Sequence, residues 1–334
     1  MKRLIIMLAG IVLTLLSATA QEKVPAVTTL EYYQTDKKGN RTLSYTLDYN
    51  DRFDIYVVHI DRPSLKGSVV LTDEAKKELI RLSKDLTLMK EKNVREKLDS
   101  DDEDSIWDFK LMLKEKDYSS LFDSGKLSTM EKVMKGGESD KKRLFEKFGR
   151  LANFLDNQLK DYQSLHPTPV VVYFYDSKGA NGLAGILRDG QGKEVDQTTD
   201  FAYVDTKEGA KVYSYHFEKT QVFDVAQPQV MQEEIVKKVK VVKYVKPEFE
   251  VFVTDAAPPK YSIAMSDGKR MSTSDDNDYK YRPKEMPSQR YDVKNHYEIF
   301  TIADKHTGYQ KAIENNYEER MEKGKARTKK NIRR

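Results

Sequence analysis

The sequence predicts an α+β fold, and three patterns along its 334 residues indicate this class. Short β-branched and aromatic segments open the folded part. Two long patterns with apolar residues three and four apart follow, as in amphipathic helices. After residue 167 the segments become short and strand-like again. We therefore expect N-terminal antiparallel strands packed with two or three amphipathic helices, then a β-rich second domain with a meander or sandwich-like sheet, and a polar C-terminal tail.

The first twenty residues have the layout of a secretory signal peptide. Lys2 and Arg3 precede an apolar run from Leu4 to Leu16, and small residues then lead to Ala20. The run is shorter than the roughly 20 apolar residues that a membrane-spanning helix needs. We expect cleavage after Ala20 and export to the periplasm or out of the cell. No later segment predicts a transmembrane helix.

Changes in composition divide the chain into four parts. Pro167 and Pro169 mark one boundary, because proline disfavours helix in the residue before it. A second change follows Met265, where Ser, Asp, Lys, Pro and Tyr become frequent. The predicted organisation is a signal peptide over 1–20, an α+β domain over 21–166, a β-rich domain over 167–265, and a linker with a short helix and basic tail over 266–334.

The first domain begins with strands and continues with helices. Alternating patterns predict a hairpin over 27–35 and 42–49, then strands over 53–60 and 67–71. Thr72 is the expected N-cap of the first helix. The apolar positions of that helix are Ala75, Leu79, Leu82, Leu86 and Met89. Residues 106–113, with the single Trp, are too short a segment to assign, and Ser128 to Glu131 has the spacing of a capping box.

The longest helix carries the clearest pattern of the chain. Its apolar stripe ends before Pro167 and needs a surface to cover it, for which the opening strands are the nearest candidate. The stripe consists of Leu144, Phe148, Leu151, Leu155, Leu159 and Tyr162.

In the second domain the expected elements are mostly strands. The apolar run over 170–175 predicts a central strand, buried on both faces. Further strands are expected over 211–217, 221–225, 236–246, 249–253 and 297–302, with a helix over 229–238 as an alternative for part of this stretch. Apolar residues four apart between Tyr309 and Met321 suggest a last short helix. No internal repeat at a fixed period is visible.

Composition excludes several functions. The chain has no cysteine, which rules out disulfides, thiolate metal sites, a cysteine nucleophile and lipid attachment through cysteine. The 58 basic and 54 acidic residues nearly balance, which argues against nucleic acid as a partner.

Candidate sites are few. The run Asp99 to Asp104 is acidic, but an EF-hand loop would need Gly at its sixth position and a carboxylate at its twelfth, where the chain has Asp104 and Lys110. A solvated loop is favoured over a looser calcium site. The glycines Gly179, Gly182 and Gly185 lack the spacing of a nucleotide-binding loop, so no cofactor is predicted.

The five histidines form no HxH, HxxxH or HExxH pair, and no GxSxG motif is present. His59 and His216 lie in expected strands, where a lone histidine is usually structural. The sequence therefore predicts no metal ligands and no catalytic residues, although a triad assembled from distant positions leaves no mark in spacing. In the basic tail, Lys329, Lys330, Arg333 and Arg334 are candidate contacts for a polyanion or an anionic membrane surface.

These observations predict an exported bacterial envelope protein with a binding or structural role, through contacts with a protein or an envelope component. The alternative is a secreted or periplasmic hydrolase that acts on glycan or peptide through carboxylates. Because no catalytic motif is present, the sequence favours a non-catalytic role over an enzyme without deciding between them.

Overall fold

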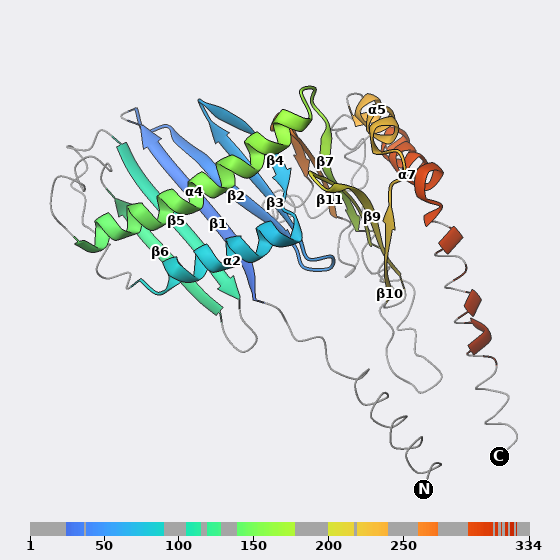
Figure 1. The fold of residues 1–334 in the computed structure, drawn as a ribbon, viewed down its shortest axis with the longest axis horizontal. Helices are drawn as coiled ribbons and strands as arrows, with labels where there is room; N and C mark the ends of the chain where they lie inside the picture. The colour runs from blue at the N-terminus through green and yellow to red at the C-terminus, as the bar shows by residue number, and fades with distance from the viewer. Residues whose placement is uncertain are drawn as a thin grey trace, which may run out of the picture. The chain divides into compact units, whose positions relative to one another are not determined.

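The computed structural model confirms the α+β class, with two antiparallel sheets and several helices (Figure 1). The residues that it describes are 25–36, 38–89, 105–114, 119–127, 139–177, 200–216, 219–239, 260–272 and 293–309, and, further on, 311, 312, 315, 318, 319, 321–323 and 325.

The first sheet contains six strands in the order β4-β3-β2-β1-β5-β6. They are β1 (Ala26–Asp36), β2 (Arg41–Asn50), β3 (Ile55–Arg62), β4 (Leu65–Val70), β5 (Ser105–Lys114) and β6 (Ser119–Leu127). Helix α2 (Asp73–Thr87) follows β4 in the chain, and helix α4 (Ser139–Leu165) follows β6. Thr72 caps α2 as expected, because its Oγ1 accepts a hydrogen bond of 3.3 Å from the backbone N–H of Ala75.

The second sheet also contains six strands, in the order β10-β9-β8-β7-β11-β12. They are β7 (Val171–Ser177), β8 (Asp200–Thr206), β9 (Gly209–His216), β10 (Lys219–Asp224), β11 (Lys260–Met265) and β12 (Arg270–Ser272). Helix α5 (Pro228–Val239) follows β10, and helix α7 (Val293–Thr307) follows β12. Strand β7 is central, as its apolar sequence predicts.

Both sheets are built by one plan. Among the described elements of each, four successive strands are followed by a helix, two strands and a helix, and the first strand pairs with the fifth. In this scheme β4 corresponds to β10, and α4 corresponds to α7. The repetition is one of topology, since the sequence shows no matching period.

By its internal contacts the chain divides into two compact units, Met1–Arg41 with Glu78–Gly149, and Thr42–Lys77 with Arg150–Arg334. Helices α2 and α4 contribute to both units. The domain boundary expected at Pro167 stays a prediction.

In the first unit, the start of α4 packs on the sheet through aromatic rings. Phe148 stacks on Tyr32 of β1 at a centroid distance of 4.3 Å and meets Phe109 of β5 edge-on at 5.0 Å. Lys147 of α4 donates a hydrogen bond to the backbone carbonyl of Asp85, which ties α4 to α2. The side chains of β1 and β5 that alternate with these aromatics, such as Tyr33 and Asp108, lie on the opposite face.

In the second unit, the rest of the α4 stripe lies against the first sheet. Leu151, Leu155, Leu159 and Tyr162 are all buried, which confirms the predicted stripe. Beside them Asp156 accepts a hydrogen bond of 2.8 Å from the Tyr45 hydroxyl and forms an ion pair of 3.0 Å with Arg62. Because Tyr45 thus faces α4, its neighbours on β2 face the other side of the sheet.

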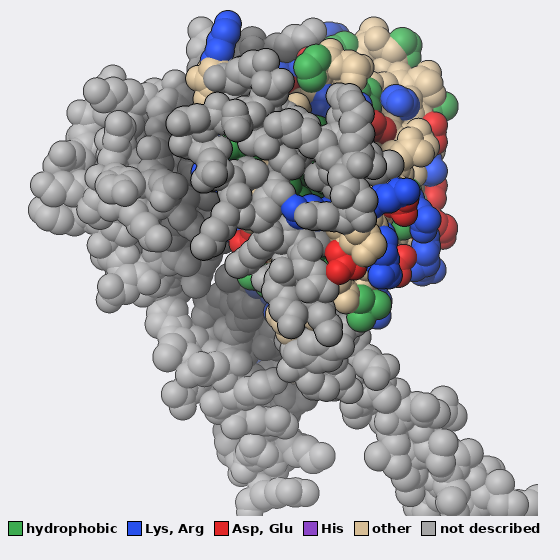
Figure 2. Space-filling view, turned by 90° about the vertical axis from the view of Figure 1, so that its left-hand side faces the viewer, with side chains coloured by type: hydrophobic (Ala, Val, Ile, Leu, Met, Phe, Trp, Pro, Cys, Tyr) green, Lys and Arg blue, Asp and Glu red, His purple; other side chains and the backbone are tan. Residues whose placement is uncertain are grey.

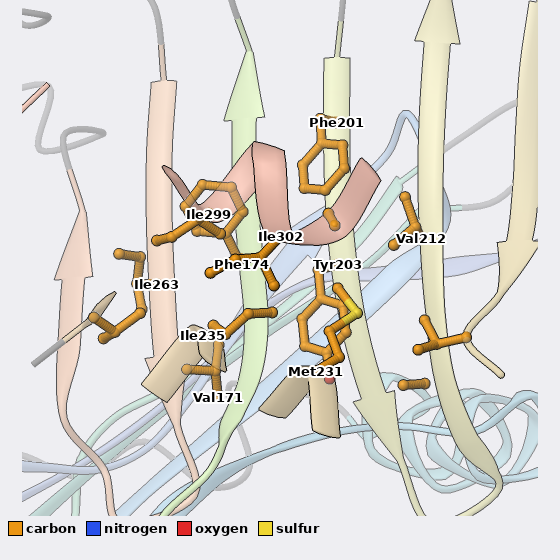
Figure 3. Close-up of a cluster of buried hydrophobic side chains, with 14 of the residues drawn as sticks. Val171, Phe174, Phe201, Tyr203, Val212, Met231, Ile235, Ile263, Ile299 and Ile302 are labelled. Atoms are coloured by element: carbon orange, nitrogen blue, oxygen red, sulfur yellow. The ribbon is translucent and has the colours of Figure 1, made fainter. Parts of the chain in front are cut away.

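The core of the second sheet lies between its strands and helices α5 and α7 (Figure 3). Val171, Phe174 and Tyr203 point from the sheet toward Ile235 of α5 and Ile299 of α7, and all five are fully buried or nearly so. Burial of this apolar set is the main stabilising contribution to this half of the unit.

One expected strand is a helix instead, and the part of another that the structure describes also lies in a helix. Residues 297–302 lie in α7, because Ile299, Ile302 and Ala303 have helical spacing and are buried together. The start of the strand expected over 236–246 belongs to α5, so the helical alternative over 229–238 was right. Residues 106–113, left unassigned above, form β5.

Candidate functional site

Within the second unit, residues of the turn between β2 and β3 bind to strands of the second sheet. Asn50 donates a hydrogen bond of 2.9 Å to the Tyr173 hydroxyl, and Arg52 forms an ion pair of 3.1 Å with buried Asp200. The Arg52 guanidinium lies over the Tyr215 ring, 4.0 Å from its centroid. Tyr173 and Tyr215 of the second sheet are therefore engaged within the protein.

In the strands that adjoin this turn, His59 of β3 lies between a polar residue of β2, Asp48, and a polar residue of β4, Ser68. Thr46 is opposite His59, and His59 is opposite Ser68, so Asp48 lies diagonally across from the histidine on the same face. His59 Nε2 lies 2.9 Å from Asp48 Oδ2, and His59 Nδ1 lies 2.8 Å from Ser68 Oγ. We call Ser68, His59 and Asp48 the cross-strand triad.

The triad has the residue types of a serine hydrolase, but its exposure is reversed. In such enzymes the serine meets the substrate and a buried aspartate orients the histidine. Here Ser68 is 0% exposed and His59 5%, while the Asp48 side chain is 55% exposed. The ring nitrogens are also exchanged, since Nδ1 rather than Nε2 faces the serine. This arrangement does not present a nucleophile to a substrate.

Charge fixes the ionisation of the aspartate. Partial desolvation acts to raise the pKa of Asp48, but the hydrogen bond and charge of His59, together with the charge of Arg270, hold that pKa below its usual value. Asp48 is thus a carboxylate that pairs with the imidazole at neutral pH.

His59 and Ser68 of the triad line a small pocket with a volume of about 30 Å³, and Asp48 is not among its lining residues. This volume corresponds to roughly two water molecules. Strands β2, β3 and β4 and the turn between β11 and β12 form its walls. Its lining residues are Leu43, Thr46, His59, Ile60, Asp61, Lys66, Gly67, Ser68, Gly268 and Arg270. We call it the edge pocket, because β4 is the outermost strand of its sheet.

Two glycines let the β11–β12 turn approach β4. A Cβ atom on Gly67 would lie 2.3 Å from the Ser266 carbonyl oxygen and 2.7 Å from Gln163 Nε2. Gly268 has a φ of +88°, a left-handed conformation that favours glycine. Gln163 of α4 donates hydrogen bonds of 2.9 and 2.8 Å to the carbonyls of Lys66 and Ser266, which holds the turn in place.

The rim of the edge pocket carries both signs of charge. Of its lining residues, Lys66 forms an ion pair of 3.1 Å with Asp61. Arg270 makes no hydrogen bond or ion pair with any residue that the structure describes, and its side chain is exposed. Its charge nevertheless acts on Asp48, whose pKa it helps to lower.

Elsewhere the buried carboxylates are occupied within the protein. Besides Asp156 and Asp200, Asp205 of β8 accepts a hydrogen bond of 2.7 Å from Gln232 of α5. Burial raises the pKa of Asp205, although Gln232 and the charge of His166 oppose this effect. In the described part of the chain these three give no pair of carboxylates facing an open cleft.

Most of the residues singled out from the sequence lie outside the described residues. These are the cleavage position Ala20, the acidic run Asp99 to Asp104, the glycines Gly179 to Gly185, and the tail residues Lys329, Lys330, Arg333 and Arg334. His59 and His216 are both in strands, as expected, and only His59 lines the edge pocket. Asp48, Ser68 and Arg270 were missed, because their proximity depends on strand register.

The described surface mixes the two signs of charge. Figure 2 shows Lys and Arg side chains interleaved with Asp and Glu over the coloured part of one face. Helix α2 is an example, with Arg81 2.6 Å from Glu78 and Lys76 2.9 Å from Asp73. A polyanion site would need a cluster of one sign. None is visible in the coloured part of that face.

Comparison with known proteins adds no relative: no family model, curated protein or solved structure matches the chain. Among the described helices, none is both long and apolar enough to cross a membrane. The described residues also contain no group of three or more His, Asp or Glu side chains placed to hold a metal ion.

Proposed function

We propose that the chain is an exported envelope protein that binds a protein partner and uses the edge pocket as a recognition site. The observation that carries this proposal is Arg270, an exposed side chain that lines the edge pocket. Arginine in such a position is typical of recognition sites, because its fixed fork of donors suits carboxylate-like groups.

The reversed exposure of the cross-strand triad favours binding over catalysis. A hydrolase would need its serine hydroxyl at the substrate, and Ser68 is fully buried. Gln163 instead bonds to the backbone carbonyls of Lys66 and Ser266 beside the pocket, and a preformed site lowers the entropy cost of binding. The apolar leader over 1–20 is the support for export.

Affinity capture from the native envelope tests this function. Columns would carry the wild-type protein, the Arg270→Gln variant, or the Arg143→Gln variant as a control that removes the same charge outside the pocket. We expect one protein to be retained by the wild type and by Arg143→Gln and to be lost with Arg270→Gln. Equal retention by all three columns would remove the edge pocket from the proposal, and no specific retention by the wild type would contradict a binding role.

A further inference from the structure

We infer that two copies of this chain associate through the outer edge of β10, strand against strand, in an antiparallel register centred on Val222. This interface lies outside the edge pocket and goes beyond the proposed binding function. Three properties of β10 support the inference: its place at the end of the sheet, the direction of its backbone groups, and the pattern of its exposed side chains.

Among the described sheet edges, β10 is the long and regular one. Proteins usually block such edges, because unpaired backbone groups accept further strands. The β11–β12 turn lies against β4, where Gln163 binds the carbonyls of Lys66 and Ser266. Strand β6 pairs irregularly with β5 and has Gly125 at a φ of 62°, and β12 has only three residues. Strand β10 has six residues and pairs with β9 without a register shift, so it has none of these three protections (Figure 1).

Alternate residues of β10 turn their backbone groups away from β9. The N–H of Val225, directly after the strand, donates to the Ala210 carbonyl at 3.1 Å. Hydrogen-bonded pairs recur at every second residue of an antiparallel ladder, so the odd-numbered residues of β10 bond to β9. The even-numbered ones are Thr220, Val222 and Asp224. Their N–H and carbonyl groups point to the outer edge, where an added strand would bond to them.

The side chains of the same three residues are exposed. Val222 is 52% exposed, and Thr220 and Asp224 lie on either side of it on the same face. Opposite Val222 on β9 is Tyr213, whose ring contacts that of Phe53 at a centroid distance of 5.6 Å. An added strand would cover the valine and extend this apolar row across the edge.

This edge is complementary to itself in the antiparallel orientation. With a two-fold axis at Val222, the valine meets its own copy, and Thr220 of each strand lies opposite Asp224 of the other. The threonine hydroxyl then donates to the carboxylate, and the backbone groups of these pairs bond across the edge. An axis at Phe223 would instead place Val222 opposite Asp224, an apolar side chain beside a charge. A second copy of the chain therefore fits the edge, and the contact closes after two copies.

Sedimentation equilibrium of the purified protein tests the inference. The range is about 10 μM to 1 mM, because an interface of one strand pair is small. Val222→Lys places two positive charges opposite each other at the axis, and we expect its dimerisation to be about tenfold weaker than that of wild type, or weaker still. Val230→Lys is the matched control, since it puts the same side chain at an exposed valine of α5, and it should dimerise as wild type does.

Mixing two charge variants distinguishes contact between the two β10 edges from any other mode of association. Val222→Lys and Val222→Glu are each expected to associate weakly. An equimolar mixture should form heterodimers, because opposite charges then meet at the axis. Circular dichroism of each variant checks that the fold is kept, which is expected since Val222 is exposed and its N–H points away from β9.

Three outcomes would overturn the inference. They are a wild type that stays monomeric over the whole range, unchanged dimerisation in Val222→Lys, and a mixture no more associated than its components.

Discussion

The side-chain amide of Gln232 forms hydrogen bonds with both backbone groups of Val171. Its Oε1 accepts from the Val171 N–H at 3.1 Å, and its Nε2 donates to the Val171 carbonyl at 2.6 Å. The pairing of β7 with β11 is irregular at this point, between Ala264 and Met265. Helix α5 thus supplies backbone-like partners where the sheet does not.

Replacing Gln232 by leucine leaves two buried backbone groups without partners. We expect a loss of about 2–4 kcal/mol in the free energy of unfolding. Urea denaturation followed by circular dichroism measures it. Glu233→Leu is the matched control, because Glu233 is the next residue of the same helix and is exposed. We expect it to change the free energy of unfolding little. Equal losses in the two variants would refute the pairing of Gln232 with the Val171 backbone.

Asp205 gives the stability a pH dependence of predictable sign. Since burial raises its pKa in the folded state above the unfolded value, folding binds a proton. The stability from this group is fully present below the unfolded pKa and is lost as the pH rises through the folded pKa. Asp205→Asn is therefore expected to be at least as stable as wild type at about pH 7, and wild type is expected to gain stability relative to the variant as the pH falls.

The measurement is the difference in unfolding free energy between wild type and Asp205→Asn across that pH range, in which the titrations of the other carboxylates cancel. A wild type that gains no stability relative to the variant as the pH falls would contradict the assigned pKa direction.

Gly67 is expected to tolerate no side chain. The Cβ of Gly67→Ala would lie against the Ser266 carbonyl at 2.3 Å, a backbone atom that cannot move aside cheaply. We expect a loss of about 2 kcal/mol or more in stability. In Gly149→Ala the new Cβ has nothing within 4 Å, and the helix is expected to gain about 0.5–1 kcal/mol. Thermal unfolding of the two variants should move in opposite directions.

Arg52 neutralises a buried charge. The Asp200 side chain is 4% exposed, and its Oδ1 has no hydrogen bond within the described residues, so Arg52→Ala leaves this carboxylate without its counter-charge. The expected cost is about 2–4 kcal/mol. Adding Asp200→Asn should recover part of it, since the buried charge is then gone. Strictly additive effects in the double-mutant cycle would show that the pair is not coupled.

Local patterns in the sequence were enough to predict a helix whose continuous apolar stripe packs on a sheet. In α4 all six residues of the predicted stripe, from Leu144 to Tyr162, are buried, because three- and four-residue spacing is set by helix geometry alone. Residues 297–302 were assigned wrongly as a strand. Their short apolar run fits either structure, and only packing of Ile299 and Ile302 on the second sheet decides between them.

The candidate site depends on information that spacing does not contain. Asp48, His59 and Ser68 meet because two successive turns fix the register of β2, β3 and β4, and a shift by one residue would send His59 to the other face. Arg270 comes from a strand two hundred residues further on, brought in by the β11–β12 turn. The single signal in the sequence was His59 itself, in the middle of an expected strand.

The shared strand order makes each half, from the first strand of a sheet to its closing helix, one copy of the same structural unit. With β1 placed on β7 and β5 on β11, residues with no similarity in sequence occupy equivalent positions in the two copies.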